Sequence, residues 1–249
     1  METHQHSHTE RKRWNHYLWE FLMLFLAVFA GFIAENLREN FVERKREKQY
    51  IVSLVDDLKK DSLILGRITR ANIKMAHGQD SLIDLMNDLK DTGSIERKCY
   101  RYYFLYTTNF LQAEFSERTI SQLLNAGNMR LIEKPGMSDS IMDYNFIVKY
   151  VQEQGKAYEE YFKKTLDLSS SIFDFTYARA DLREDFTMVP KIPKSDPKLL
   201  TTDPAILKKY AIQLSLSKGI LQGYVLSMKQ AKDRAVALIS LLKKKYRLE

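Results

Sequence analysis

A stretch of fourteen residues near the N-terminus carries no charge, and no other feature constrains the fold of this chain as strongly. The stretch covers residues 21–34. A helix of this length spans only ~21 Å, which is less than the ~30 Å hydrocarbon core of a bilayer. Trp14 and Trp19 precede the stretch and Leu37 follows it. A helix over residues 14–37 therefore reaches about 36 Å and places aromatic rings at one headgroup level, and we expect it to cross a membrane.

Two other interpretations of this stretch stay open. Arg11, Lys12 and Arg13 precede an apolar run of signal-peptide length, and a small-residue cleavage site lies at residues 28–30. A helix that is apolar on all sides also occurs in the core of soluble proteins. We prefer the membrane helix because the helical pattern continues beyond residue 30 without a break, and because aromatic residues flank the run.

The expected membrane helix carries its small residues on one face. Ala27, Gly31 and Ala34 share a stripe, because residues four and seven apart lie on the same side of a helix. Small residues let two helix backbones approach closely, so we expect this face to pack on another helix. The alternative is a lipid-facing helix in which these residues are incidental.

The orientation of the helix is not determined by its flanking charges. Three basic residues lie close before the span and five lie close after it, which favours a large domain on the cytoplasmic side. Glutamates interleave with the second group, and long domains are translocated with little regard to charge. Both orientations therefore stay open for the expected cell-membrane protein.

Residues 1–13 form a basic tail that contains His4, His6 and His8. Alternating histidines bind transition metals weakly. Nothing near them in the sequence fixes a ligand geometry, so we expect a solvated tail with no metal.

The rest of the chain is poor in turn-forming residues. Only 9 Gly and 5 Pro occur in 249 residues, which argues against a many-stranded sandwich or barrel and favours long helices. A single cysteine, Cys99, cannot form an internal disulfide and cannot anchor a zinc site alone. We expect an all-α protein in which the N-terminal transmembrane helix continues into an antiparallel, elongated, four-helix-bundle-like domain over residues 38–249.

Apolar residues recur at every third or fourth position and predict four helical segments. The first continues the membrane helix to about residue 89, and a turn follows at residues 91–94. The second covers residues 96–126 with a break near residues 114–116, and the third begins near residue 138. The fourth begins at Pro204 behind Asp203, which is a favourable N-cap. Residues 186–204 hold four of the five prolines and predict an extended connection.

Two segments of the chain resemble a known family. One is the apolar span with the continuation Glu-Asn-Leu-Arg-Glu at 35–39 and Tyr-Ile-Val-Ser-Leu-Val-Asp-Asp-Leu at 50–58, and the other is Thr-Ile-Ser-Gln-Leu-Leu-Asn-Ala-Gly-Asn-Met-Arg-Leu-Ile at 119–132. Together they look like the uncharacterised single-pass membrane proteins of Bacteroidota bacteria. The resemblance covers roughly residues 12–62 and 115–150. It implies a membrane-anchored helical domain and no catalytic chemistry.

No motif for catalysis is present in the sequence. The chain lacks a Gly-rich phosphate loop, His-Glu-x-x-His, Cys-x-x-Cys and Gly-x-Ser-x-Gly, as well as the Glu-x-x-His pairs of di-metal bundles. Adjacent carboxylates such as Asp56 and Asp57 point apart on a helix and are typical of a solvated face. We therefore expect no enzymatic activity, no cofactor and no bound metal.

An aromatic cluster between residues 100 and 115 includes Tyr100, Tyr103 and Tyr106. Such density usually fills a bundle core, but the hydroxyl groups leave a ligand groove open as an alternative. Two functions follow. The first is a membrane-tethered scaffold that binds another protein or a second copy of itself, and the second is a sensor module that holds a small ligand among these aromatics. We prefer the scaffold because the sequence contains no output domain.

The positive charge of the chain is concentrated at its end. Residues 201–249 hold 10 basic and 3 acidic residues, while the formal net charge of the whole chain is +7. The basic residues do not alternate with aromatic or polar readers, so we expect no nucleic-acid partner. An antiparallel bundle returns its fourth helix towards the bilayer, so Lys243, Lys244, Lys245 and Arg247 are expected at the membrane interface, together with Trp14 and Trp19. Favourable interaction with the negative end of their own helix is the alternative role of these cations.

Overall fold

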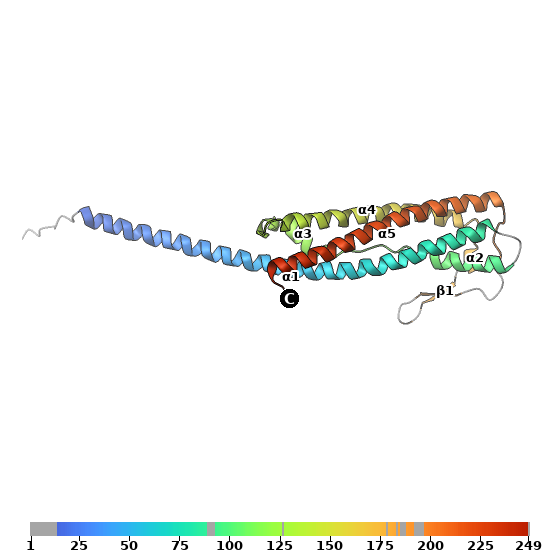
Figure 1. The fold of residues 1–249 in the computed structure, drawn as a ribbon, viewed down its shortest axis with the longest axis horizontal. Helices are drawn as coiled ribbons and strands as arrows, with labels where there is room; N and C mark the ends of the chain where they lie inside the picture. The colour runs from blue at the N-terminus through green and yellow to red at the C-terminus, as the bar shows by residue number, and fades with distance from the viewer. Residues whose placement is uncertain are drawn as a thin grey trace, which may run out of the picture. The chain divides into compact units, whose positions relative to one another are not determined.

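The computed structural model describes residues 14–88, 93–125, 127–177, 179–182, 184, 188–191 and 197–248. The five helices of these ranges are α1 (Trp14–Asn87), α2 (Gly93–Tyr106), α3 (Arg118–Asn125), α4 (Met137–Ser169) and α5 (Pro204–Tyr246) (Figure 1). Two 3-10 turns, η1 (Asn128–Leu131) and η2 (Phe175–Tyr177), and two short strands, β1 (Arg179–Leu182) and β2 (Met188–Lys191), complete the elements. The expected all-α class is confirmed.

The chain divides into two units, Met1–Gln49 and Tyr50–Glu249. The second unit begins at Tyr50, whereas the sequence analysis starts the bundle at residue 38. Among the described residues, α1 is the one helix long and apolar enough to cross a membrane. Its most apolar window has a mean hydropathy of 2.0 and none of that window is buried. The described part of the first unit lies wholly within this helix, since residues 1–13 lie outside the described residues.

The second unit is built on three long helices, α4, α5 and the part of α1 from Tyr50 onward, which lie side by side (Figure 1). At 1.5 Å per residue α4 is ~50 Å long and α5 is ~65 Å long. Three clusters of buried side chains follow one another along this unit, and α1 and α5 contribute to each of them. Because each helix turns one apolar stripe to the others, the core is long and narrow.

The expected second helix, residues 96–126, is not one helix. α2 ends at Tyr106, and residues 107–117, which we name the strap, are non-helical up to the start of α3. The predicted break at residues 114–116 lies inside the strap, but it covers only three of the eleven residues of the strap. Thr107 and Thr108 end α2, since their hydroxyls donate to the carbonyls of Tyr103 (2.6 Å) and Phe104 (2.8 Å). This local bonding and the branching at Cβ weaken a helix.

The other predicted boundaries agree more closely. α5 begins at Pro204, and the side chain of Asp203 accepts the Ala205 N–H at 2.8 Å, as an N-cap does. Gly127 adopts the positive φ of 63° that the turn after α3 needs. In the expected extended connection, β2 pairs antiparallel with β1 and sets Pro190 opposite Ala180. Residues 89, 91–92, 126, 186–187 and 192–196 of these predictions lie outside the described residues.

Candidate functional site

Four polar side chains of α1 are buried along one face of the helix. Asp57, Asp61, Asn72 and Gln79 are each at most 3% exposed. Their spacing places them within ~60° of each other around the helix axis. Buried polar groups need hydrogen-bond partners, and one segment of the chain supplies a partner to each of these four.

The strap and its two ends supply those partners in antiparallel order. Gln79 donates to the carbonyl of Tyr106 (3.1 Å) and Asn72 to that of Leu111 (3.3 Å). Asp61 accepts the backbone N–H of Ser116 at 2.9 Å, and Asp57 accepts the hydroxyl of Thr119. We name these four contacts the polar ladder.

The polar ladder explains why the strap is extended. From Gln79 to Asp61, α1 rises ~27 Å, and the chain covers this rise with the ten residue steps from Tyr106 to Ser116. A helix of ten residues reaches only ~15 Å, whereas an extended chain reaches ~33 Å. The strap therefore cannot be helical and satisfy both ends of the ladder.

Asp61 also joins α4 to the ladder. Its second carboxylate oxygen accepts the hydroxyl of Tyr144 at 2.9 Å. Burial raises the pKa of Asp61, and the N–H of Ser116 and the hydroxyl of Tyr144 act against that rise. Burial likewise raises the pKa of Tyr144. On the α5 side, the hydroxyl of Tyr224 accepts the N–H of Ala113 at 2.7 Å, so α1 and α5 both bond the strap, and α4 bonds Asp61.

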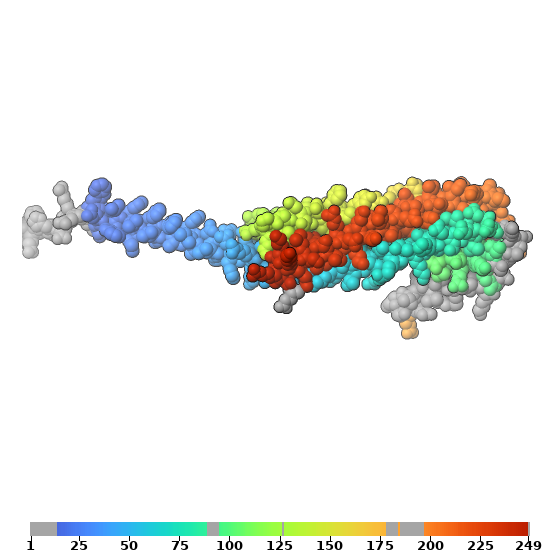
Figure 2. All heavy atoms as spheres, viewed as in Figure 1, coloured from blue at the N-terminus to red at the C-terminus, as the bar shows by residue number. Residues whose placement is uncertain are grey.

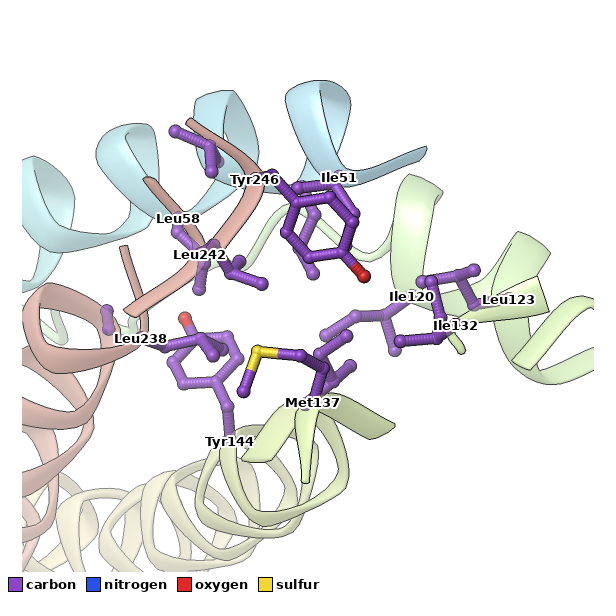
Figure 3. Close-up of a cluster of buried hydrophobic side chains, with 14 of the residues drawn as sticks. Ile51, Leu58, Ile120, Leu123, Ile132, Met137, Tyr144, Leu238, Leu242 and Tyr246 are labelled. Atoms are coloured by element: carbon purple, nitrogen blue, oxygen red, sulfur yellow. The ribbon is translucent and has the colours of Figure 1, made fainter. Parts of the chain in front are cut away.

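The two segments that carry the family resemblance meet at one end of the second unit. Tyr50 accepts a hydrogen bond from the side-chain amide of Asn128 at 3.0 Å, and Asp57 bonds Thr119. Figure 3 shows Ile51 of the first segment facing the same cluster as Ile120 and Ile132 of the second. Sequence reasoning found the two segments but not their contact, because hydrogen bonds between residues 50–58 and 119–132 leave no mark in either segment alone.

The aromatic residues chosen as a candidate groove do not stay together. Tyr100 and Tyr103 are at most 1% exposed and belong to a buried cluster with Phe173. The hydroxyl of Tyr100 donates to the carbonyl of Lys198 (3.0 Å) and accepts the N–H of Asp174 (2.8 Å), while that of Tyr103 bonds Ser169 (2.9 Å). These bonds use the hydroxyl groups inside the core. Of the three residues, only Tyr106 reaches an open groove.

That groove lies between α1 and α2 and has a volume of about 590 Å³. Its walls carry Asp84 on α1, Asp88 directly after α1, and Lys98 and Arg101 on α2. Tyr106 closes one part of it, with its ring packed directly on α1 at Gly78. The groove can therefore receive a small molecule that carries both a positive and a negative charge.

The expected membrane residues are exposed. Trp14 is 85% exposed and Trp19 is 63% exposed, and Ala27, Gly31 and Ala34 are exposed as well. A Cβ built on Gly31 meets no atom within 4 Å. Nothing in the described chain covers this small face.

The four C-terminal cations lie at the end of α5. Lys243, Lys244 and Lys245 form its last turn, and Arg247 follows in a left-handed conformation with φ of 51°. The cluster of Figure 3 places Tyr246, between them, against Ile51, so α5 ends where the chain enters the second unit.

The described residues contain no group of three or more His, Cys, Asp or Glu side chains that could hold a metal ion. His4, His6 and His8 lie outside them. Cys99 is fully buried, and its burial raises the pKa of the thiol to about 12, which leaves it unreactive at neutral pH.

No protein-family model matches this chain, and no curated protein or solved structure is similar enough to match it. The family resemblance of residues 12–62 and 115–150 therefore stays a prediction.

Proposed function

We propose that this protein is a membrane-anchored helical scaffold, held in a cell membrane by residues 14–37 and binding a partner protein through α5. The observation that carries the proposal is an uncharged face on α5. Ile212, Leu216 and Leu226 are each more than half exposed. With Gly219 and Gly223, which are also exposed, they lie within ~80° around the helix axis.

This uncharged face suits a helix of another protein. The exposed leucine and isoleucine side chains supply apolar area, and the two glycines let a second backbone approach closely. A Cβ on Gly219 meets no atom within 4 Å, so no part of the described bundle fills that position. Figure 2 shows α5 lying open along its length between α4 and α1.

The α5 proposal predicts site-specific crosslinking in the native membrane. A photoreactive amino acid at Leu216 is expected to give an adduct of one defined mass, while the same group at Lys229, exposed on another side of α5, gives none. Gly219→Glu is expected to lower the Leu216 adduct at least tenfold without lowering the melting temperature, because the new side chain enters open space. An adduct of twice the chain mass identifies a second copy as the partner. Equal adducts from both positions, or an adduct that survives Gly219→Glu, contradict the proposal.

The membrane anchor makes a separate prediction. The protein is expected to stay in the membrane fraction after carbonate extraction, and mass spectrometry of the purified chain is expected to recover peptides from residues 1–34. Carbonate removes proteins that lie on a surface but not a helix that crosses the bilayer. A mature chain that begins at Gly31 would instead identify residues 1–30 as a cleaved signal peptide.

The groove between α1 and α2 favours a second function, in which the bundle holds a small zwitterionic ligand. The supporting observation is the pairing of an acidic wall with a basic wall beside Tyr102 and Tyr106, whose rings are 5.7 Å apart. We rank this function second because two of the three predicted groove tyrosines use their hydroxyls inside the core.

A further inference from the structure

One end of the second unit gathers basic side chains. At this end the last turn of α5 lies beside Ile51, and the segment before α4 lies beside α5. Lys134 of that segment donates to the carbonyl of Lys245, and its Nζ lies 3.9 Å above the ring of Tyr246. We name the side chains of Lys134, Lys243, Lys244, Lys245 and Arg247 the basic end.

Two of the last carbonyls of α5 are bonded without the side chains of Lys243, Lys244, Lys245 and Arg247. The backbone N–H groups of Arg247 and Leu248 both bond the carbonyl of Lys243. Lys134 bonds the carbonyl of Lys245. The free carbonyls at a helix C-terminus are the groups that cations stabilise, and here the backbone and Lys134 already bond two of them.

The remaining cations point to a partner outside the bundle. Lys244, Lys245 and Arg247 are exposed. Within the part of the chain that the structure describes, none of their side chains takes part in an ion pair. Glu133 is the nearby acid of the segment before α4, and it has an interaction of its own. Such a cluster attracts an anionic surface.

We propose that the basic end binds the anionic headgroups of a lipid bilayer. This inference rests on the proposed membrane anchor at residues 14–37. Only residues 38–49 separate that span from Tyr50, and a chain of this length reaches at most ~45 Å even when extended. The basic end lies at the Tyr50 end of the unit, so this connecting segment is short enough to let it reach the headgroups. Each Lys or Arg near an anionic surface raises the population at that surface roughly fivefold, within about a Debye length.

The test uses the full chain in lipid nanodiscs that carry a nitroxide on a fixed share of headgroups. A fluorophore is attached to Pro135→Cys at the basic end or, as a matched control, to Thr202→Cys before α5. Both positions are exposed, whereas Cys99 is fully buried and stays unlabelled. Discs of neutral lipid are compared with discs containing about a third anionic lipid. We expect at least twofold more quenching of the Pro135 probe in anionic discs, reversal in high salt, and no change for the Thr202 probe.

The variant with Lys243, Lys244, Lys245 and Arg247 changed to Gln is expected to lose this gain while its melting temperature stays within a few degrees. Equal quenching in neutral and anionic discs, or a gain that the Gln variant keeps, overturns the inference. Binding of a soluble polyanion by the basic end, with no gain in quenching in anionic discs, assigns it to nucleic acid and overturns the inference too. If the chain does not enter the discs, the proposed membrane anchor is contradicted. That result is distinguished from the others because the protein then no longer co-elutes with the discs.

Discussion

Asp61→Ala is expected to lower the free energy of unfolding of the second unit by about 3 kcal/mol. The carboxylate accepts both the N–H of Ser116 and the hydroxyl of Tyr144, and Asp61 is only 2% exposed. Alanine leaves the buried hydroxyl of Tyr144 and the half-buried N–H of Ser116 without an acceptor, and a buried donor without a partner costs ~1–3 kcal/mol. Urea unfolding of the full chain in detergent micelles, followed by circular dichroism, measures the change. A loss below ~1 kcal/mol would show that the polar ladder does not hold the strap.

Asp61→Asn separates the hydrogen bonds from the charge. Asparagine keeps an acceptor for Ser116 and adds a donor that Tyr144 can accept, so at pH 7 we expect a stability within ~1 kcal/mol of wild type. Because the pKa of Asp61 is raised above its ordinary value by burial, the folded state binds the proton more tightly than the unfolded state. The free energy of unfolding of wild type, compared with that of Asp61→Asn, is therefore highest below about pH 4. This difference falls as the pH rises through the raised pKa.

The same titration needs a control for other carboxylates. Asp57 adds to the rise in the pKa of Asp61 and faces the same side of α1. Asp56→Asn alters an exposed neighbour on the same helix, which pairs with Lys59, and controls for the substitution itself. A difference between wild type and Asp61→Asn that does not change with pH, or one that grows with pH, would contradict the assignment of this pH dependence to Asp61.

Gly78→Ala is expected to lower the free energy of unfolding by about 2 kcal/mol. A Cβ at this position would stand 2.1 Å from two ring atoms of Tyr106, so the ring must leave its seat on α1. We expect this net loss even though alanine inside a helix is ~1 kcal/mol more stabilising than glycine. Gln79, the next residue, bonds the carbonyl of Tyr106, so displacement of the ring also strains the first contact of the polar ladder.

Two comparisons identify the clash as the cause. Gly66→Ala in the same helix meets only the movable ends of Lys232, at 3.3 Å, and Arg70, at 3.8 Å, and is expected to be neutral or to stabilise by up to ~1 kcal/mol. In a Tyr106→Ala background, Gly78→Ala is expected to become neutral or stabilising because the ring is gone. Urea unfolding of wild type, of the two single variants at Gly78 and Tyr106 and of the double variant gives a double-mutant cycle. If Gly78→Ala lowers the free energy of unfolding equally in both backgrounds, the role of Gly78 is not to make room for the ring of Tyr106.

The break of the second helix shows where sequence reasoning met its limit. Thr107 and Thr108 are a local signal, and their hydroxyl bonds to α2 follow from side-chain chemistry that a sequence displays. The extended path as far as Ser116 is a different matter, because it depends on Asp61 and Asn72 lying on α1 at matching heights. No pattern within residues 107–117 encodes the spacing of these two side chains along α1.

The adjacent acids on α1 make the same point with two residues. The sequence predicts that Asp56 and Asp57 point apart, and they do: Asp56 is exposed and Asp57 is buried. The expectation that such a pair marks a solvated face was wrong for Asp57, which bonds Thr119 across the bundle. Helix periodicity gives the angle between two side chains, but which angle faces the core depends on the neighbouring segment.

The sequence by itself determined the all-α class, the apolar length of the first helix, the start of α5 at its Asp203 cap and the concentration of cations at the C-terminus. These follow from properties local to one helix: apolar periodicity, run length and capping chemistry. Only the tertiary structure decided that the strap is extended, that Tyr100 and Tyr103 are core residues, and that α5 ends beside Tyr50. Each of these depends on contacts between residues that lie far apart in sequence, where burial and hydrogen-bond partners are set by what another segment places opposite.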